Sequence, residues 1–288
     1  FAAVLSVFLL GTSLGAALYQ RSGRRVTSPW LLTDLLAGIS LTCILGIFAL
    51  WKAQPIYDAS RAALGDSSIG VLVAEMTVAG AVFLSPTFFM GATFSHLVQA
   101  ARRPDGGVGQ AAALNTFGGA VAPALFGVFL LPLIGSKWTL VLISLGYLLL
   151  LPNVAGWRWG FLAAPIALVF ALPANVHVVR IPPGGRLVEY REGVMASVAV
   201  VEDAARHRVL RVNNRFQMGG TAAANAEYRQ AHIPLLLHPA PQRALLLGLG
   251  TGITLGAASL HPNVQSDGIE LVPEVVEAMP QFEPYNFS

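Results

Sequence analysis

A glycine-rich loop near the end of the sequence carries the clearest chemical signal. The loop reads Gly248-Leu249-Gly250-Thr251-Gly252 and follows an apolar run, Ala244–Leu247, that predicts a buried strand. A run of small residues then predicts a helix that reaches Leu260. Glycines let a backbone turn sharply and come close to a ligand, and the following helix begins with free N–H groups. We therefore predict that the glycines of this loop and Thr251 bind part of a ligand.

An acidic residue on the next predicted strand completes this pattern. Glu270 lies in the run Ser266–Leu271, roughly 20 residues beyond the loop, where an acid can bind both hydroxyls of a ribose. Ile253 stands where a G-x-G-x-x-G motif would have its last glycine, so the spacing favours an S-adenosylmethionine-type nucleoside over NAD. The order of strand, loop, helix, strand and acid predicts a βαβ unit with a parallel sheet.

The segment before the loop has the pattern of a small antiparallel sheet. Short β-prone runs at 187–190, 196–201 and 209–212 are separated by polar turns, and a helical run follows at 222–237. Residues 175–240 are therefore predicted to form a linker and a small sheet region. Residues 241–288 are predicted to begin a nucleoside-binding domain with a parallel sheet, which we expect to be truncated.

The composition assigns the first 174 residues to a membrane. The 288 residues are 55% hydrophobic and 11% charged, against about 25% charged in an ordinary soluble domain. Because a helix needs roughly 20 apolar residues to cross a bilayer, the long uncharged runs predict a polytopic helical domain with about five or six spans. The candidate spans are 1–19, 29–51, 69–94, 111–134, 138–151 and 159–172. The sequence begins inside the first of these runs without a methionine, so we expect a fragment.

Charge and cysteine content exclude several classes of protein. The net charge is +3 and no basic run or stripe is present, which argues against a nucleic-acid partner. A single cysteine, Cys43, permits no intrachain disulfide, and the histidines lack the spacing of metal ligands, so we predict no metal site.

The arginines give the predicted orientation of the membrane domain. They cluster in the first, third and fifth connections between spans, and positive-inside counting makes these connections cytoplasmic. The arginines concerned are Arg21, Arg24, Arg25, Arg102, Arg103 and Arg158. Six crossings would then place the C-terminal half outside, whereas a nucleoside ligand favours the cytoplasm. We resolve the conflict by expecting that one of the two short spans does not cross fully.

Several polar or helix-breaking residues within the spans could mark a transport path. Ionisable groups in a membrane are costly and usually face the interior of a bundle, but each of these residues also has an ordinary structural explanation. They are Glu75, His96, Asn115, Pro86, Pro123 and Pro132. The glycines from Gly118 to Gly127 are predicted to permit close helix packing.

The ordered motifs of the C-terminal half resemble the spermidine synthase-like family, the polyamine aminopropyltransferases, in the bacterial form that follows a multi-span membrane domain. The match covers roughly residues 187–288, and the order of its motifs is more specific than any one of them. The matching segments are 212–217 (Val-Asn-Asn-Arg-Phe-Gln), 232–239 (His-Ile-Pro-Leu-Leu-Leu-His-Pro), 246–252 and 268–271.

This resemblance implies transfer of an aminopropyl group from decarboxylated S-adenosylmethionine to a polyamine such as putrescine, without a metal. It also implies that the small sheet precedes a Rossmann-like domain of the class I methyltransferase type, which begins at residue 241 and is truncated. It implies that Gly248, Gly250 and Gly252 form the nucleoside loop and that Glu270 binds the ribose. Gln217 matches a glutamine between the sheet and the helix that follows it, where an ordinary turn residue is as good an interpretation.

The sequence departs from the family where the family carries amine-binding groups. An aspartate of the family's glycine loop is replaced by Thr251, a tyrosine–histidine pair by Ala226 and Glu227, and an acidic pair by Ala222 and Ala223. Glu227 could restore an acid, although a solvated helix face is the preferred interpretation. The family's catalytic aspartate corresponds to a position beyond Ser288, so no catalytic residue is assigned.

Three functions remain open on this sequence. The first is a spermidine synthase-like transferase anchored in the inner membrane, with the soluble half in the cytoplasm and a homodimer as the expected assembly. The second is a methyltransferase that uses S-adenosylmethionine itself. The third is a polyamine or nucleoside transporter or sensor in which the membrane half acts.

Overall fold

The computed structural model describes residues 2–22, 30–65, 67–102, 107–152, 154–173, 176 and 179–287. The chain divides into two compact units, 1–178 and 179–288, which are described separately. Some residues of the predictions lie outside the described part: the span starts Phe1 and Pro29, the arginines Arg24, Arg25 and Arg103, and the boundary residues Ala174 and Asn175.

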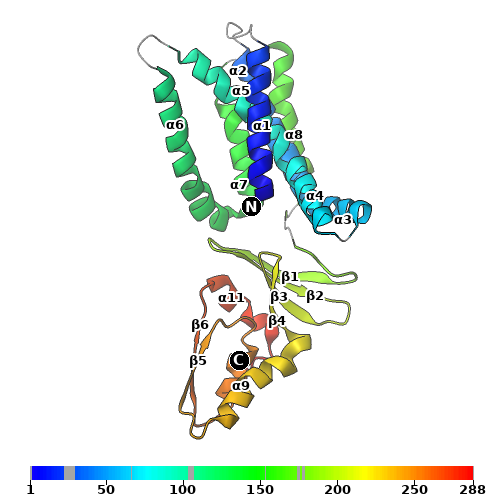
Figure 1. The fold of residues 1–288 in the computed structure, drawn as a ribbon, viewed down its shortest axis with the longest axis vertical. Coiled ribbons are helices and arrows are strands. Elements are labelled where there is room, and N and C mark those ends of the chain that lie inside the picture. Colours follow the sequence, from blue (N-terminus) through cyan, green and yellow to red (C-terminus); the bar gives the residue numbers. More distant parts are fainter. Residues whose placement is uncertain are drawn as a thin grey trace. The chain divides into compact units, whose positions relative to one another are not determined.

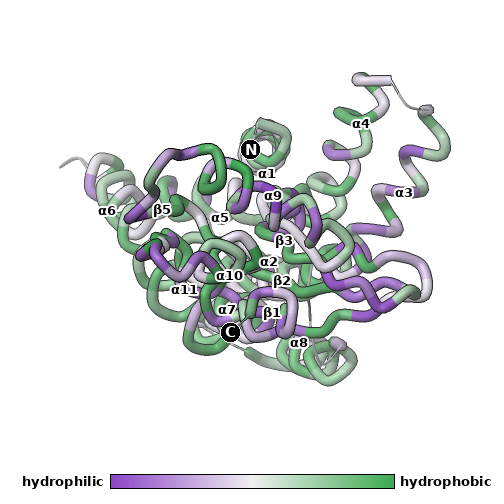
Figure 2. The backbone as a smooth tube through the Cα atoms, turned by 90° about the horizontal axis from the view of Figure 1, so that it is seen from below, coloured by the Kyte–Doolittle hydropathy of each residue, from purple (hydrophilic) through white to green (hydrophobic). Residues whose placement is uncertain are grey.

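The N-terminal unit is helical, and four continuous helices among its described residues are long and apolar enough to cross a membrane: Ala2–Arg21, Leu31–Trp51, Ser68–Ala100 and Gly107–Leu149. Its elements are α1 (Ala2–Arg21), α2 (Leu31–Trp51), α3 (Ala53–Leu64), α4 (Ser68–Ala79), η1 (Gly80–Leu84), α5 (Ser85–Ala100), α6 (Gly107–Ala122), η2 (Pro123–Leu130), α7 (Leu131–Leu149), η3 (Gly156–Arg158) and α8 (Trp159–Ala171). Within the described residues of this unit, the helices are predominantly hydrophobic, while α3 carries several hydrophilic stretches (Figure 2).

The longest of these helices is broken at one glycine. Gly135 has a φ of 77° and a ψ of 166°, which are not helical values. The chain reverses direction between α6 and α7, as Figure 1 shows. The predicted runs 111–134 and 138–151 therefore correspond to two arms of one element. The π-helical segments η1 and η2 lie beside Pro86 and Pro123, which lack the N–H group that a regular helix would use.

Helices α1 and α5 pack through glycines that the sequence analysis did not single out. Gly11 and Gly15 form a G-x-x-x-G motif on α1. A Cβ atom on Gly15 would lie 1.9 Å from the Phe88 carbonyl oxygen of α5, and one on Gly91 would lie 2.1 Å from the Thr12 carbonyl oxygen of α1. Only glycine allows these backbones to approach so closely, as in other membrane helix pairs.

The predicted close packing of the glycines between Gly118 and Gly127 is wrong for the described residues. A Cβ atom on Gly118, Gly119 or Gly127 would meet nothing within 4 Å, and α6 has no buried residue. These glycines lie on a helix whose sides contact few other elements of the unit, so small side chains find no partner there.

The short helix α8 extends along α2 from its first turn to its last turns. Arg158, just before α8, forms a two-pronged ion pair with Asp34 in the first turn of α2, with Nε–Oδ1 and Nη2–Oδ2 distances of 2.7 and 3.1 Å. Leu172, just after α8, packs in a cluster with Ile44 and Ile47 from the second half of α2. The expectation that one short span stops before the far end therefore does not fit α8.

The polar residues of the predicted transport path are not brought together. Glu75 is exposed on α4. His96 on α5 is buried, and its Nδ1 atom lies 3.0 Å from the Tyr19 hydroxyl of α1. Asn115 on α6 lines a groove of about 880 Å³ beside Ser6, Ser13 and Gly91, away from the other two. The described part of the unit thus gives the transport path no common site.

The C-terminal unit begins with the predicted antiparallel sheet. Its strands are β1 (Arg186–Glu192), β2 (Ser197–Glu202), β3 (Arg208–Val212) and β4 (Phe216–Gly220), paired in the order β1-β2-β3-β4. The first three strands were predicted and the fourth was not. Val198, Val200 and Leu210 are buried in one cluster with Val275 of α11 (Pro273–Ala278) and Phe282 of η5 (Met279–Phe282). This apolar cluster holds the sheet against the end of the chain.

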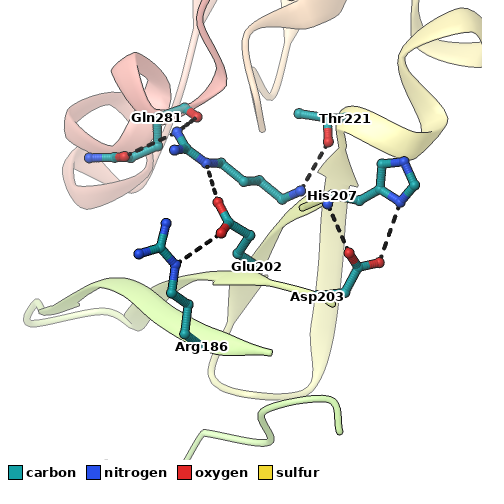
Figure 3. Close-up of polar contacts among 7 residues, drawn as sticks. Arg186, Glu202, Asp203, His207, Thr221 and Gln281 are labelled. Carbon is teal, nitrogen blue, oxygen red and sulfur yellow. Dashed lines mark hydrogen bonds and ion pairs between the residues drawn. The ribbon is translucent and has the colours of Figure 1, made fainter. Parts of the chain in front are cut away.

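A buried carboxylate reinforces the same contact (Figure 3). Glu202 at the end of β2 accepts hydrogen bonds from Arg186 at 2.9 Å and from Arg208 at 3.2 Å. Arg208 also donates to the backbone oxygen of Gln281 at 2.6 Å. The bonds from Arg186 and then from Arg208 hold the pKa of Glu202 below its usual value. Glu202 is thus a structural carboxylate whose partners are both cations.

Candidate functional site

The glycine loop joins a strand to a helix, as predicted, but the strand is not the buried one that was expected, because Leu245 and Leu247 are 60% and 76% exposed. Strand β5 (Arg243–Leu247) pairs in parallel with β6 (Gln265–Ile269), and α10 (Ile253–Ser259) connects them. The Gly248 N–H donates to the Ile269 carbonyl oxygen at 2.8 Å, so the loop starts at the carboxyl end of both strands. In open α/β sheets, this edge is where ligands bind.

Three loop residues adopt conformations that favour glycine. The φ angles of Gly248, Gly250 and Gly252 are 83°, 53° and 78°. A Cβ atom on Gly250 would lie 2.5 Å from the Met218 carbonyl oxygen of β4. A Cβ atom on the exposed Gly248 would meet nothing within 4 Å. The loop is therefore packed against protein at Gly250 and open at Gly248, where another molecule can approach the backbone.

Glu270 is held beside this loop by backbone N–H groups. Its Oε2 atom accepts from Leu249 at 2.9 Å, and its Oε1 atom accepts from Leu271 at 2.8 Å and Val272 at 3.0 Å. Partial burial raises the pKa of the Glu270 carboxyl, but these backbone donors outweigh it, so the pKa is below the ordinary value. The carboxylate is thus ionised and oriented by the loop itself.

Thr251 is in the loop, but its side chain faces the protein interior. The residue is completely buried, and its hydroxyl donates to the Glu227 carboxylate of α9 (Ala224–Leu237). The preferred interpretation of Glu227 as part of a solvated helix face is therefore wrong. Its Oε1 atom also accepts from the Gly220 N–H at 2.9 Å, so the side chain joins α9 to both β4 and the loop.

Gln217 lies on β4, and its side chain is exposed. It pairs with Arg211 of β3 rather than forming part of a turn. Ala222, Ala223 and Ala226, at the positions where the resemblance implies polar groups, are all exposed. Among the residues that the structure describes, no group of three or more histidine, cysteine or acidic residues could hold a metal ion.

Sequence reasoning missed two residues of this region. Gly219 has a φ of 107°, and a Cβ atom there would lie 2.6 Å from Glu227 Oε1. Asn286 is buried and donates to the Thr251 carbonyl oxygen at 3.3 Å. The Gly219-Gly220 pair is visible in the sequence as a signal for close backbone approach, whereas nothing in the sequence pairs Asn286 with a loop 35 residues away.

Comparison with known proteins gives a similarity of limited extent. No protein-family model matches the chain, and no curated protein matches it. Among solved structures, the chain is similar to the spermidine synthase from Thermotoga maritima, with 23% sequence identity and a TM-score of 0.32. The match covers 34% of this chain and 34% of the synthase.

Proposed function

We propose that the C-terminal unit binds an S-adenosylmethionine-type nucleoside, with its ribose on Glu270 and its backbone contacts at Gly248. The observation that carries this proposal is the Glu270 carboxylate. It is ionised, bonds only to backbone N–H groups among the described residues, and lies beside the open loop glycine Gly248. A carboxylate without a cationic partner is suited to accept hydrogen bonds from two ribose hydroxyls.

We further propose that the protein is a membrane-anchored, spermidine synthase-like transferase with a Rossmann-like nucleoside domain. The reaction would move an aminopropyl group from decarboxylated S-adenosylmethionine to a polyamine such as putrescine. The attacking amine must be neutral and aligned with the carbon beside the sulfonium, so the loop and Glu270 contribute by fixing the nucleoside in place. No described residue is assigned to removal of the amine proton.

Methyl transfer from S-adenosylmethionine is the second candidate. It is favoured by the side chains that replace amine-binding groups: Ala222, Ala223 and Ala226 are exposed and apolar, and the Thr251 hydroxyl is buried. A cationic diamine would find no carboxylate at these positions.

Calorimetric titration of the complete chain in detergent tests both candidates. We expect a nucleoside to bind, with decarboxylated S-adenosylmethionine preferred and with binding lost in Glu270→Ala. Asp267→Asn is the matched control because Asp267 lies on β6, the strand that leads to Glu270, and bonds to Arg243 outside the loop. Preference for S-adenosylmethionine would favour the methyltransferase, and equal binding by wild type and Glu270→Ala would refute the site.

We also propose a location that suits this ligand: the protein lies in the inner membrane, with its C-terminal unit in the cytoplasm. Since α8 runs beside α2 from Asp34 to Ile47, this location places the end of α1 on the opposite side, which reverses the positive-inside prediction for the arginines of the first connection. With Cys43 replaced by serine, an impermeant thiol reagent should label Ser22→Cys in intact cells and label Ala205→Cys only after permeabilisation. The reverse pattern would place the C-terminal unit outside and contradict this location.

A further inference from the structure

Both oxygen atoms of Thr251, the side-chain hydroxyl and the main-chain carbonyl, form hydrogen bonds. Its hydroxyl donates to Glu227 Oε2, and its carbonyl oxygen accepts from Asn286 Nδ2 at 3.3 Å. The residue has no exposed surface. Its neighbours Gly250 and Gly252 both have left-handed φ angles, so the loop turns on either side of the fixed threonine.

Glu227 connects this threonine to the antiparallel sheet. One carboxylate oxygen holds the Thr251 hydroxyl, and the other accepts from the Gly220 N–H at 2.9 Å. The last residues of β4 fit around the carboxylate because Gly219 has no side chain at a place where a Cβ atom would lie 2.6 Å from Oε1. A shift of α9 would therefore move Glu227 and alter its hydrogen bond to Thr251 in the loop.

Asn286 connects the same threonine to the end of the chain. It is 3% exposed, and its Nδ2 atom donates to the Met279 carbonyl oxygen at 2.9 Å as well as to Thr251. Its own carbonyl oxygen lies against Gly256 of α10, where a Cβ atom would be only 1.9 Å away. Asn286 thus holds the loop and the first turn of α10 together.

We infer that Thr251, Glu227 and Asn286 form a clamp that fixes the glycine loop in its ligand-binding conformation, with Glu227 and Asn286 as positioning residues rather than ligand contacts. Its effect on affinity rests on the proposed nucleoside site, whereas its effect on the loop does not. A loop that is already ordered loses less conformational freedom when a ligand binds, and the ligand binds more tightly.

Hydrogen exchange of the complete chain, without nucleoside, tests the clamp directly. We expect Thr251→Val to raise the exchange rates of the amides from Gly250 to Ile253, because it removes the hydroxyl and keeps the shape of the side chain. Thr251→Ser should restore the wild-type rates. Ser259→Ala is the matched control, since that hydroxyl donates to the Gly256 carbonyl oxygen within α10 and bonds to none of the three clamp residues.

Calorimetric titration of the same variants with decarboxylated S-adenosylmethionine gives the second measurement. Loss of one charge-assisted hydrogen bond predicts an affinity about tenfold weaker in Thr251→Val and unchanged affinity in Thr251→Ser and Ser259→Ala. If Thr251→Val does not fold, Asn286→Ala replaces it, because that change leaves the threonine in place.

The outcomes separate the two proposals. Wild-type exchange rates in Thr251→Val would refute the clamp, whether or not a nucleoside binds. Raised exchange together with unchanged affinity would refute its effect on the ligand. Raised exchange in a chain that binds no nucleoside even as wild type would refute the proposed function and support the clamp.

Discussion

The loop at Gly248–Gly252 and helix α6 are both rich in glycine, yet the structure uses the glycines of the loop and leaves those of the helix free. In the loop, all three glycines have left-handed φ angles, and Gly250 and Gly252 would collide with neighbours if they carried a Cβ atom. In α6, Gly118 and Gly119 are helical and meet nothing within 4 Å. A glycine is therefore informative only together with its backbone angle or its neighbour.

The glycines between α1 and α5 resemble those of the loop, because larger residues there would also collide with neighbouring atoms. Gly11, Gly15 and Gly91 would each place a Cβ atom within 2.1 Å of an atom of the other helix. Spacing distinguishes them from the glycines of α6 in the sequence, because Gly11 and Gly15 are four residues apart and share a helix face. The comparison predicts a graded series of effects.

The largest effect is expected in the loop. Gly250→Val forces a β-branched residue to a φ of 53° and against the Met218 carbonyl oxygen. The unfolding free energy of the C-terminal unit should fall by about 2–5 kcal/mol, and nucleoside binding should be lost. Denaturant unfolding followed by circular dichroism measures the first effect. A variant as stable as wild type would show that the loop tolerates other conformations.

A smaller loss is expected in the membrane unit. Gly15→Leu places a large side chain against the Phe88 carbonyl oxygen, and overpacking of this kind costs about 1–3 kcal/mol. Thermal unfolding in detergent should begin at a lower temperature than in wild type. An unchanged transition would mean that α1 and α5 can separate without cost.

Acid should weaken the loop through Glu270. The pKa of its carboxyl is below the ordinary value of 4.5, so the folded state binds the proton less readily than the unfolded state. Its contribution to stability is complete above pH 4.5 and is lost as the pH falls through the lowered pKa. The difference in unfolding free energy between wild type and Glu270→Gln should therefore shrink below that pH. A constant difference would show that the backbone bonds to Glu270 do not favour its charged form.

The smallest effect is expected on α6. Gly119→Leu should not lower stability and could raise it by up to about 0.8 kcal/mol, because the side chain enters open space on a helix that favours leucine over glycine. The same thermal measurement as for Gly15→Leu serves here. A loss as large as that of Gly15→Leu would mean that α6 has a close neighbour in the membrane.

Local patterns predicted the elements whose signal is contained in a few consecutive residues. The strands β5 and β6, the loop and Glu270 appeared in the expected order because an apolar run, a glycine turn and an acid are each visible locally. The burial expected for β5 was wrong, since burial depends on what packs against a strand. Strand β4 was missed because Gly219 and Gly220 are poor strand formers, and its pairing with β3 supplies the missing preference.

Contacts between distant residues could not be predicted in this way. Glu227 was expected on a solvated helix face, since nothing next to it in the sequence points to Thr251, which lies 24 residues away. The glycines of α6 were expected to pack closely, but packing depends on which helix lies opposite. Both errors concern the partner of a residue rather than its own conformation.

The most direct test of the central claim compares a nucleoside with its 2′-deoxy analogue. If Glu270 binds the ribose, wild type should bind decarboxylated S-adenosylmethionine at least about tenfold more tightly than the 2′-deoxy form, and Glu270→Gln should lose most of that difference. A difference that is the same in wild type and in Glu270→Gln would contradict the claim, because the ribose would then be recognised elsewhere.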